Sequence, residues 1–116
     1  MARRSRRDFG YHFELEDFRD LLKGIENELV DVLKELKEDD PEKYEENKYD
    51  FRAFKSFVWD TFRIMTDLDD LDVLLFDERD EPVWITDELS ALKAIDKYYK
   101  PLKQFLRDVI KKVERE

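Results

Sequence analysis

Cysteine is absent from this chain of 116 residues, and histidine occurs once, as His12. The lack of cysteine excludes a disulfide framework, thiolate catalysis and any zinc or iron–sulfur site that is built on cysteine ligands. The sequence also shows no secretory signal pattern. Because disulfides belong to oxidising compartments, we expect an intracellular, cytoplasmic protein.

Glycine is almost as scarce, since Gly10 and Gly24 are the only two. A glycine-rich loop that cradles phosphates is therefore excluded. Side-chain amides number three, at Asn27, Asn47 and Gln104, while Glu and Lys are abundant. This thermophile-like balance is typical of proteins from hot habitats, where ion-pair networks are favoured. No apolar run approaches the roughly 20 residues that a membrane-spanning helix needs, so we expect no membrane contact.

Charge and aromatic rings are what the chain has in excess. Charged residues make up 46% of the sequence, well above the roughly 25% of an average domain. Aromatic residues make up 14%, and a chain so rich in Phe, Tyr and Trp can bury enough apolar surface to fold. At 116 residues the chain is large enough for one domain with its own core.

The charges are segregated along the chain. Residues 1–7 contain four arginines and no acid, residues 8–90 contain 10 bases and 27 acids, and residues 91–116 contain eight bases and four acids. Such segregation predicts either ion pairing between the acidic body and the basic last segment, which we favour, or two surfaces of opposite sign. Residues 1–12 lack periodicity and are interpreted as a flexible basic arm before a single domain, residues 13–116.

The first helix is predicted over about residues 13–38, with His12 at its start. Its apolar residues alternate at intervals of three and four, as in a coiled-coil seam, and three more widen the face: Leu15, Phe18, Leu22, Ile25, Leu29, Val32 and Leu36, with Leu21, Val30 and Leu33. A face of this width predicts a bundle or a contact with a second chain. Gly24 inside the helix indicates close approach by a neighbouring segment.

Asp40 and Pro41 are expected to end this helix and to begin the next, because Asp is a good N-cap and Pro suits the first helical position. The second helix is predicted from Pro41 to about Leu68, antiparallel to the first. A break at Asn47, with Asp50 as a fresh cap, is the alternative.

A β-hairpin is predicted after the second helix, because residues 73–76 and 83–85 are strand-forming runs on either side of a polar loop. The alternative is a continued helix that includes Leu75. Thr86 is expected to cap a last helix that runs to about Arg115. Pro101 is expected to kink this helix or to divide it near Tyr98, and we favour one kinked helix. The predicted fold is mainly α with a minor α+β character: a bundle of three long helices with a short β-hairpin before the last helix.

Two faces are predicted on the second helix. One covers about half of the circumference and is expected to be core: Phe51, Phe54, Phe57, Val58, Phe62, Ile64, Met65 and Leu68. Outside this arc a positive stripe spans about 80° and consists of Arg52, Lys55, Trp59 and Arg63. We predict that the stripe binds a partner, because Trp and Arg dominate interaction hot spots. The alternative is that the arginines stack on the Trp59 indole and pair with nearby carboxylates.

Pairs of acids one helical turn apart can hold a divalent metal. Four such pairs occur in the sequence: Asp17/Asp20, Glu28/Asp31, Glu35/Glu38 and Glu42/Glu45. Because they flank or oppose the apolar seam instead of lining a cleft, we expect no metal site, no cofactor and no catalytic residue. No Ser–His arrangement occurs either, so the chain is predicted to be non-enzymatic.

We therefore expect a small acidic regulatory module that binds a partner protein, or a second copy of itself, through its helical seams. A second hypothesis is an acidic mimic of duplex DNA, of the phage, virus or mobile-element type, that inhibits a nucleic-acid-handling enzyme. Third, the order helix–helix–hairpin–helix is similar to that of winged-helix DNA-binding regulators. The acidic wing tip, residues 77–81, would repel DNA, so direct binding of nucleic acid is not favoured.

Overall fold

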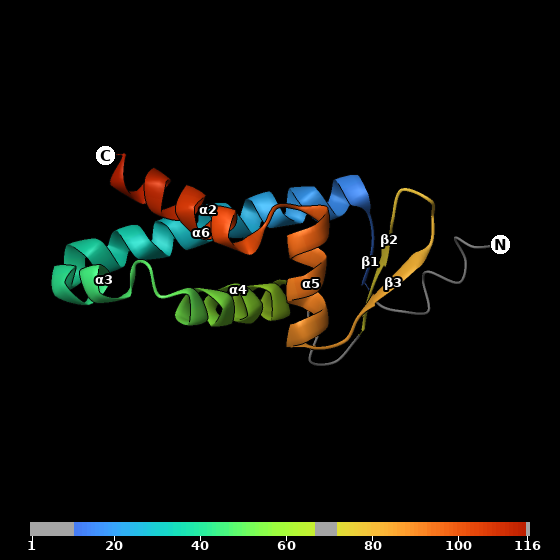
Figure 1. Ribbon diagram of the computed structural model, residues 1–116, viewed down its shortest axis with the longest axis horizontal. Helices are drawn as coiled ribbons and strands as arrows, with labels where there is room; N and C mark the ends of the chain where they lie inside the picture. Colours follow the sequence, from blue (N-terminus) through green and yellow to red (C-terminus); the bar gives the residue numbers. More distant parts are fainter. Residues whose placement is uncertain (1–10, 67–71, 116) are drawn as a thin grey trace.

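The computed structural model describes residues 11–66 and 72–115, and these contain five helices and three short strands (Figure 1). In chain order the elements are β1 (Tyr11–Glu14), α2 (Leu15–Asp39), α3 (Pro41–Asn47), α4 (Phe51–Thr66), β2 (Val73–Phe76), β3 (Pro82–Ile85), α5 (Glu88–Tyr98) and α6 (Leu102–Glu114). The prediction of a mainly helical fold with a small β component is confirmed. The finer prediction of three long helices differs from the structure, because two of the predicted helices are each divided into two.

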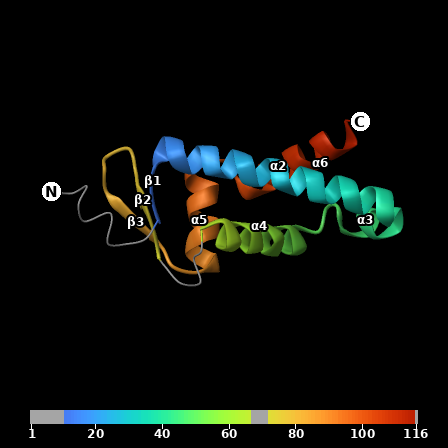
Figure 2. The same cartoon turned by 180° about the vertical axis from the view of Figure 1, so that it is seen from behind.

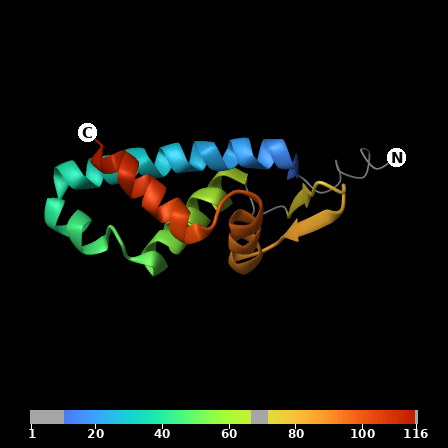
Figure 3. The same ribbon diagram turned by 45° about the horizontal axis from the view of Figure 1, so that its top comes forward.

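The molecule is elongated, with extents of 53, 26 and 21 Å along its principal axes. α2 and α4 run in opposite directions along the long axis, α6 lies against α2, and α5 crosses between these helices and the sheet (Figures 1 and 3). The strands form the end of the molecule at which α2 begins. One core joins side chains of α2, α4, α5, α6 and the sheet.

α2 begins and ends close to the predicted bounds, at Leu15 and Asp39. The central residues of its predicted seam are buried, namely Phe18, Leu22, Ile25 and Leu29. Asp40 caps α3, since its Oδ1 accepts a hydrogen bond from the backbone N–H of Lys43 at 3.2 Å. Pro41 stands in the first turn, where its missing N–H costs no hydrogen bond, as the sequence predicts.

The predicted second helix is divided in two, and the alternative prediction of a break at Asn47 is confirmed. α3 ends at Asn47 and α4 begins at Phe51. The carboxylate of Asp50 accepts a hydrogen bond from the backbone N–H of Ala53 at 3.1 Å, which is the contact of a fresh N-cap. α4 ends at Thr66, and Leu68 lies outside the described residues.

A hairpin is present as predicted, but it belongs to a three-stranded sheet and precedes α5, not the last helix, α6. β2 and β3 pair antiparallel with Val73 opposite Ile85, and Leu75 lies in a strand, so the alternative of a continued helix through Leu75 is wrong. β2 reads as a continuous apolar run because it is the central strand of the sheet, and all four of its residues are buried.

A third strand was not predicted. β1 pairs in parallel with β2, with Tyr11 opposite Val73. His12 therefore lies in a strand and is exposed, and the expectation that it starts the first helix is wrong. Tyr11 and His12, which were assigned to the basic arm, belong to the sheet, whereas residues 1–10 lie outside the described part of the chain.

The N-cap of α5 is Asp87, and not Thr86 as expected. The Asp87 Oδ1 accepts the backbone N–H of Ser90 at 2.9 Å, and the Ser90 Oγ accepts the backbone N–H of Asp87 at 3.1 Å. This reciprocal pair is a capping box, which satisfies two backbone donors at once. The serine three residues after Asp87 decides the position of the cap.

Pro101 divides the last predicted helix instead of kinking it. α5 ends at Tyr98 and α6 begins at Leu102, and the carboxylate of Asp96 accepts the Leu102 backbone N–H at 2.9 Å. Proline lacks an N–H and disfavours the helical conformation of the residue before it, so the helix stops here. The two halves point in different directions, and α5 closes the space between α4 and the sheet (Figure 1).

Gly24 provides a first test of the fold. It is exposed in the middle of α2, and a Cβ atom added to it would meet nothing within 4 Å, so the predicted close approach by a neighbour is wrong. Gly24→Ala is therefore expected to raise the free energy of unfolding by about 0.5–1 kcal/mol, because alanine loses less backbone entropy in a helix. Urea unfolding measures the change, and a destabilised variant would mean that a segment does pack against Gly24.

Candidate functional site

α4 places the predicted positive stripe on one flank of the bundle. Trp59 is half-buried and packs against the core, while Arg52 is exposed. The Lys55 Nζ lies 4.8 Å from the centroid of the Phe51 ring, and the Arg63 guanidinium pairs with the Asp60 carboxylate at 3.5 Å. The structure thus brings the four residues to one side of a helix, with the indole partly used for packing.

The other flank of α4 is apolar and open to solvent. Phe57 is 38% exposed and Ile64 is 69% exposed. Together with Ala53, they form a row that we call the outer stripe, with residues spaced by four and seven positions on one side of the helix. Met65, beside the row, is 43% exposed. The expectation that Phe57, Ile64 and Met65 belong to the core is therefore wrong.

The outer stripe is exposed because no helix covers it among the described residues. The faces of α4 that are buried carry Phe54, Val58, Phe62 and Thr66, which is a narrower arc than the sequence predicts. A single last helix could have run along α4 over its whole length. The division at Pro101 instead turns α5 across the end of α4 and sends α6 along α2.

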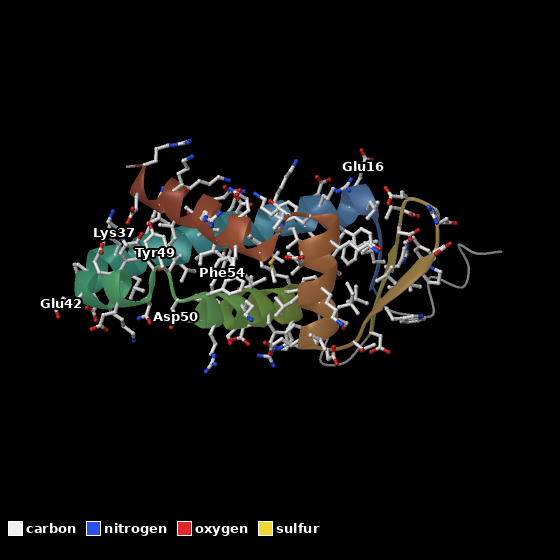
Figure 4. The ribbon with its side chains drawn as sticks, in the orientation of Figure 1. Glu16, Lys37, Glu42, Tyr49, Asp50 and Phe54 are labelled. Carbon is white, nitrogen blue, oxygen red and sulfur yellow. The ribbon has the colours of Figure 1, made fainter. Side chains whose placement is uncertain are left out.

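A groove lies beside the outer stripe, between α2 and α4, with a volume of about 280 Å³. Figure 2 shows these two helices from behind, with α6 beyond them. We call this groove the α4 groove. Its lining comes from four helices and the turn after α3: Leu29, Leu33, Leu36, Lys43, Asn47, Lys48, Ala53, Phe54, Phe57 and Leu106. Phe54 points from α4 towards α6 (Figure 4), where its ring centroid is 5.3 Å from that of Phe105. The walls of the groove are therefore apolar, and its polar residues all come from the segment 43–48.

The rim of the groove on α2 is acidic. Glu28 and Glu35 each precede a groove leucine and are exposed. On a helix, neighbours in sequence are about 100° apart, so these carboxylates flank the apolar wall and do not enter it. Asp60 on α4 is exposed as well, and on the helix it lies within about 60° of the residues of the outer stripe. Positive charge therefore suits the α2 side of the groove, while Lys43 and Lys48 line its α3 end and suit negative charge.

A second cluster of polar side chains surrounds Glu26, which is only 2% exposed. Its carboxylate accepts hydrogen bonds from the Tyr99 Oη at 2.5 Å, the Lys112 Nζ at 2.5 Å and the Lys100 Nζ at 3.1 Å. Burial raises the pKa of Glu26, but these hydrogen bonds outweigh burial and hold it below its ordinary value. Burial and the hydrogen bond to Glu26 together raise the pKa of Tyr99.

The Glu26 cluster joins α2 to both sides of the turn at Pro101. Because three donors already engage the carboxylate, it is poorly suited to act as a general base. Glu26 was not predicted as a buried residue. Its position could have indicated burial, because Glu26 lies four residues after Leu22 and four residues before Val30, and both of these are buried on the same helix.

The acid pairs noted in the sequence are all exposed, and within residues 11–66 and 72–115 no three His, Asp or Glu side chains converge in a group that could hold a metal ion. Over the same ranges, no helix combines the length and the apolar character that crossing a bilayer requires.

Protein-family models, curated proteins and solved structures give no match to the chain.

Proposed function

We propose that this chain is a non-enzymatic interaction module that binds an amphipathic helix of a partner protein in the α4 groove and along the outer stripe. The observation that carries the proposal is an exposed apolar row that continues from an apolar groove. Monomeric proteins rarely leave large apolar side chains together at the surface without a use for them. The proposed activity is binding and regulation through contact, as the width of the helical seams predicts.

The dimensions favour a helix as the occupant. The outer stripe extends from Ala53 to Ile64, which is about 16 Å along α4 and about three helical turns. A partner helix with apolar residues at intervals of three and four would place one anchor in the groove and others on the stripe, which is the common helix-in-groove mode of recognition. A compact small molecule would fill the groove and leave Ile64 exposed.

The acidic rim specifies the charge of the partner. Glu28 and Glu35 lie along the α2 side of the groove, so lysine or arginine on the flank of the bound helix would meet opposite charge. These rim contacts contribute more to partner choice and association rate than to affinity. The proposed ligand is thus an amphipathic helix with basic residues on the flank that meets α2, whereas Lys43 and Lys48 at the α3 end of the groove favour an acidic residue there.

The test is a selection of displayed helical peptides on the immobilised chain. We expect the selected peptides to carry apolar residues at intervals of three and four with basic residues beside them. The double variant Phe57→Glu/Ile64→Glu is expected to weaken their binding at least about tenfold, because it puts two charges where apolar anchors dock. Leu89→Glu is the matched control, since Leu89 is 62% exposed on α5, away from the groove.

Two results would contradict the proposal. One is a selection that gives no helical binder, and the other is a set of binders that are unaffected by Phe57→Glu/Ile64→Glu. If these binders are lost in Trp59→Ala with the fold intact by circular dichroism, the site is the positive stripe of Arg52, Lys55, Trp59 and Arg63. A natural partner that handles DNA and is displaced by duplex would favour the DNA-mimic hypothesis instead.

A further inference from the structure

α6 and its C-cap carry a row of positive charge, inclined to the helix axis, on an otherwise acidic protein. The row consists of Lys103, Arg107, Lys111 and Arg115, which are spaced by four residues and are all exposed. We call it the basic ridge. Its residues follow one another at about 6 Å along the helix, and the whole row is about 18 Å long.

The basic ridge is not neutralised by the chain itself. Two other lysines of this region, Lys100 and Lys112, are used internally, because both bind the carboxylate of Glu26. In contrast, within the described ranges Arg107, Lys111 and Arg115 form no ion pair. The internal pairing expected from the charge segregation thus accounts for only part of the basic last segment.

Two acids, Asp108 and Glu114, lie among the ridge residues, and both already accept hydrogen bonds from side chains outside the ridge. The Asp108 carboxylate accepts hydrogen bonds from the Lys100 Nζ and the Gln104 amide, both at 2.7 Å. The Glu114 carboxylate binds the Lys48 Nζ at 2.9 Å and the Tyr44 Oη at 3.1 Å. The hydrogen bond from Lys100 lowers the pKa of Asp108. Each acid is therefore balanced by a lysine outside the ridge, and the ridge keeps its charge.

α2 carries a row of opposite sign with the same interval. Asp31, Glu35 and Asp39 are spaced by four residues and are exposed, and we call them the acidic ridge. Asp31 and Arg115 line one shallow hollow between α2 and α6, so the two ridges approach each other at these residues. Equal spacing allows each cation of one ridge to face a carboxylate of the other without a change of helix geometry.

We propose that the basic ridge of α6 docks on the acidic ridge of α2 in a second copy of the chain. A twofold pair would make this contact twice, because each copy supplies both ridges. The contact shares Glu35 with the rim of the α4 groove, but it uses neither the apolar wall of the groove nor the outer stripe, so it does not depend on the function proposed for them. Exposed ion pairs contribute little each, so the dimer is weak, with a dissociation constant on the order of 0.1–1 mM at moderate salt.

The experiment is a charge exchange between two variants, followed by sedimentation velocity at concentrations up to about 1 mM. We expect the natural chain to associate at about 0.1 M salt and to dissociate at about 1 M, where the Debye length falls from about 10 Å to about 3 Å. Arg107→Glu/Lys111→Glu and Asp31→Lys/Glu35→Lys are each expected to stay monomeric. Mixed in equal amounts they are expected to associate again, since the two new carboxylates of one variant can pair with the two new lysines of the other, and the two unchanged ridges can pair as in the natural chain.

The control is Lys23→Glu/Lys93→Glu, which makes the same charge change at exposed lysines outside the basic ridge and is expected to keep the association. The proposal is overturned by a natural chain that stays monomeric, by a mixture that associates no more than its components, or by a control that dissociates like the ridge variant. Association that survives both ridge variants and is lost in Phe57→Glu/Ile64→Glu would also overturn it, and would assign self-association to the α4 groove.

Discussion

Replacing Glu26 with alanine is expected to lower the free energy of unfolding by about 3 kcal/mol, because it removes the shared acceptor of a buried hydrogen-bond cluster. Alanine leaves the Tyr99 hydroxyl and one donor of Lys100 without their partner, and both are partly buried. The replacement also removes the hydrogen bonds that link α2 to the turn at Pro101. Urea unfolding at neutral pH measures it.

Glu28→Ala is the matched control for this prediction. Glu28 lies on the same helix, is exposed, and its replacement is expected to change stability by no more than about 0.5 kcal/mol. If the two variants lose the same small amount, the carboxylate of Glu26 does not hold the helices together, and the description of the cluster is wrong.

The stability that Glu26 contributes has a pH signature. Its pKa in the folded state is lowered from 4.5, so the ionised form is favoured by folding. Such a group stabilises the fold at pH values above its unfolded pKa, and this stability is lost as pH falls through the lower folded pKa. The difference in the free energy of unfolding between the natural chain and Glu26→Gln is therefore expected to be largest at neutral pH and to become smaller in acid. A difference that is constant with pH would show that charge is not its cause.

Phe105→Ala is expected to destabilise the fold as much as Glu26→Ala, and to lower the free energy of unfolding by about 3–4 kcal/mol. Phe105 is fully buried, and its ring makes edge contacts with Phe54 of α4 and Tyr99 beside Pro101, at centroid distances of 5.3 and 5.5 Å. Truncation would leave a cavity where three segments meet, and these cannot all move inward to fill it. Denaturant unfolding, with the slope checked against the natural chain, gives the value.

Phe57→Ala makes the same chemical change on the open flank of α4. Phe57 is 38% exposed, so the expected loss is below about 1 kcal/mol. The contrast between the two phenylalanines tests the placement of the α4 groove as well as the core. Equal losses would mean that Phe57 is buried in solution, and the outer stripe would then not be available to a partner.

Local signals predicted several elements correctly. The period of three and four residues located α2 to within two residues at each end, and Asp40 with Pro41 marked the start of α3. The strand-forming runs around an acidic loop predicted β2 and β3. These features depend on residues close together in the chain, so the sequence carries their signal directly.

The candidate site was predicted only in part. The sequence identified α4 as the informative helix and grouped Arg52, Lys55, Trp59 and Arg63 on one side of it. It assigned Phe57, Ile64 and Met65 to the core, because hydrophobic periodicity shows which side of a helix is apolar and not whether a neighbour covers it. The α4 groove is formed by residues from four helices, and no local pattern reports such a combination.

The amino-acid sequence by itself predicted the helical character of the chain, the cap at Asp40, the two strands of the hairpin, an interruption at Pro101, and the separation of acidic and basic segments. The tertiary structure alone decided that β1 joins β2, that α6 lies against α2, and that Glu26 is shared by Tyr99, Lys100 and Lys112. Each of these is a contact between residues far apart in sequence, and its free energy exists only when the other elements are in place. The exposed outer stripe and the basic ridge have the same origin, since both are surfaces that the packed helices leave uncovered.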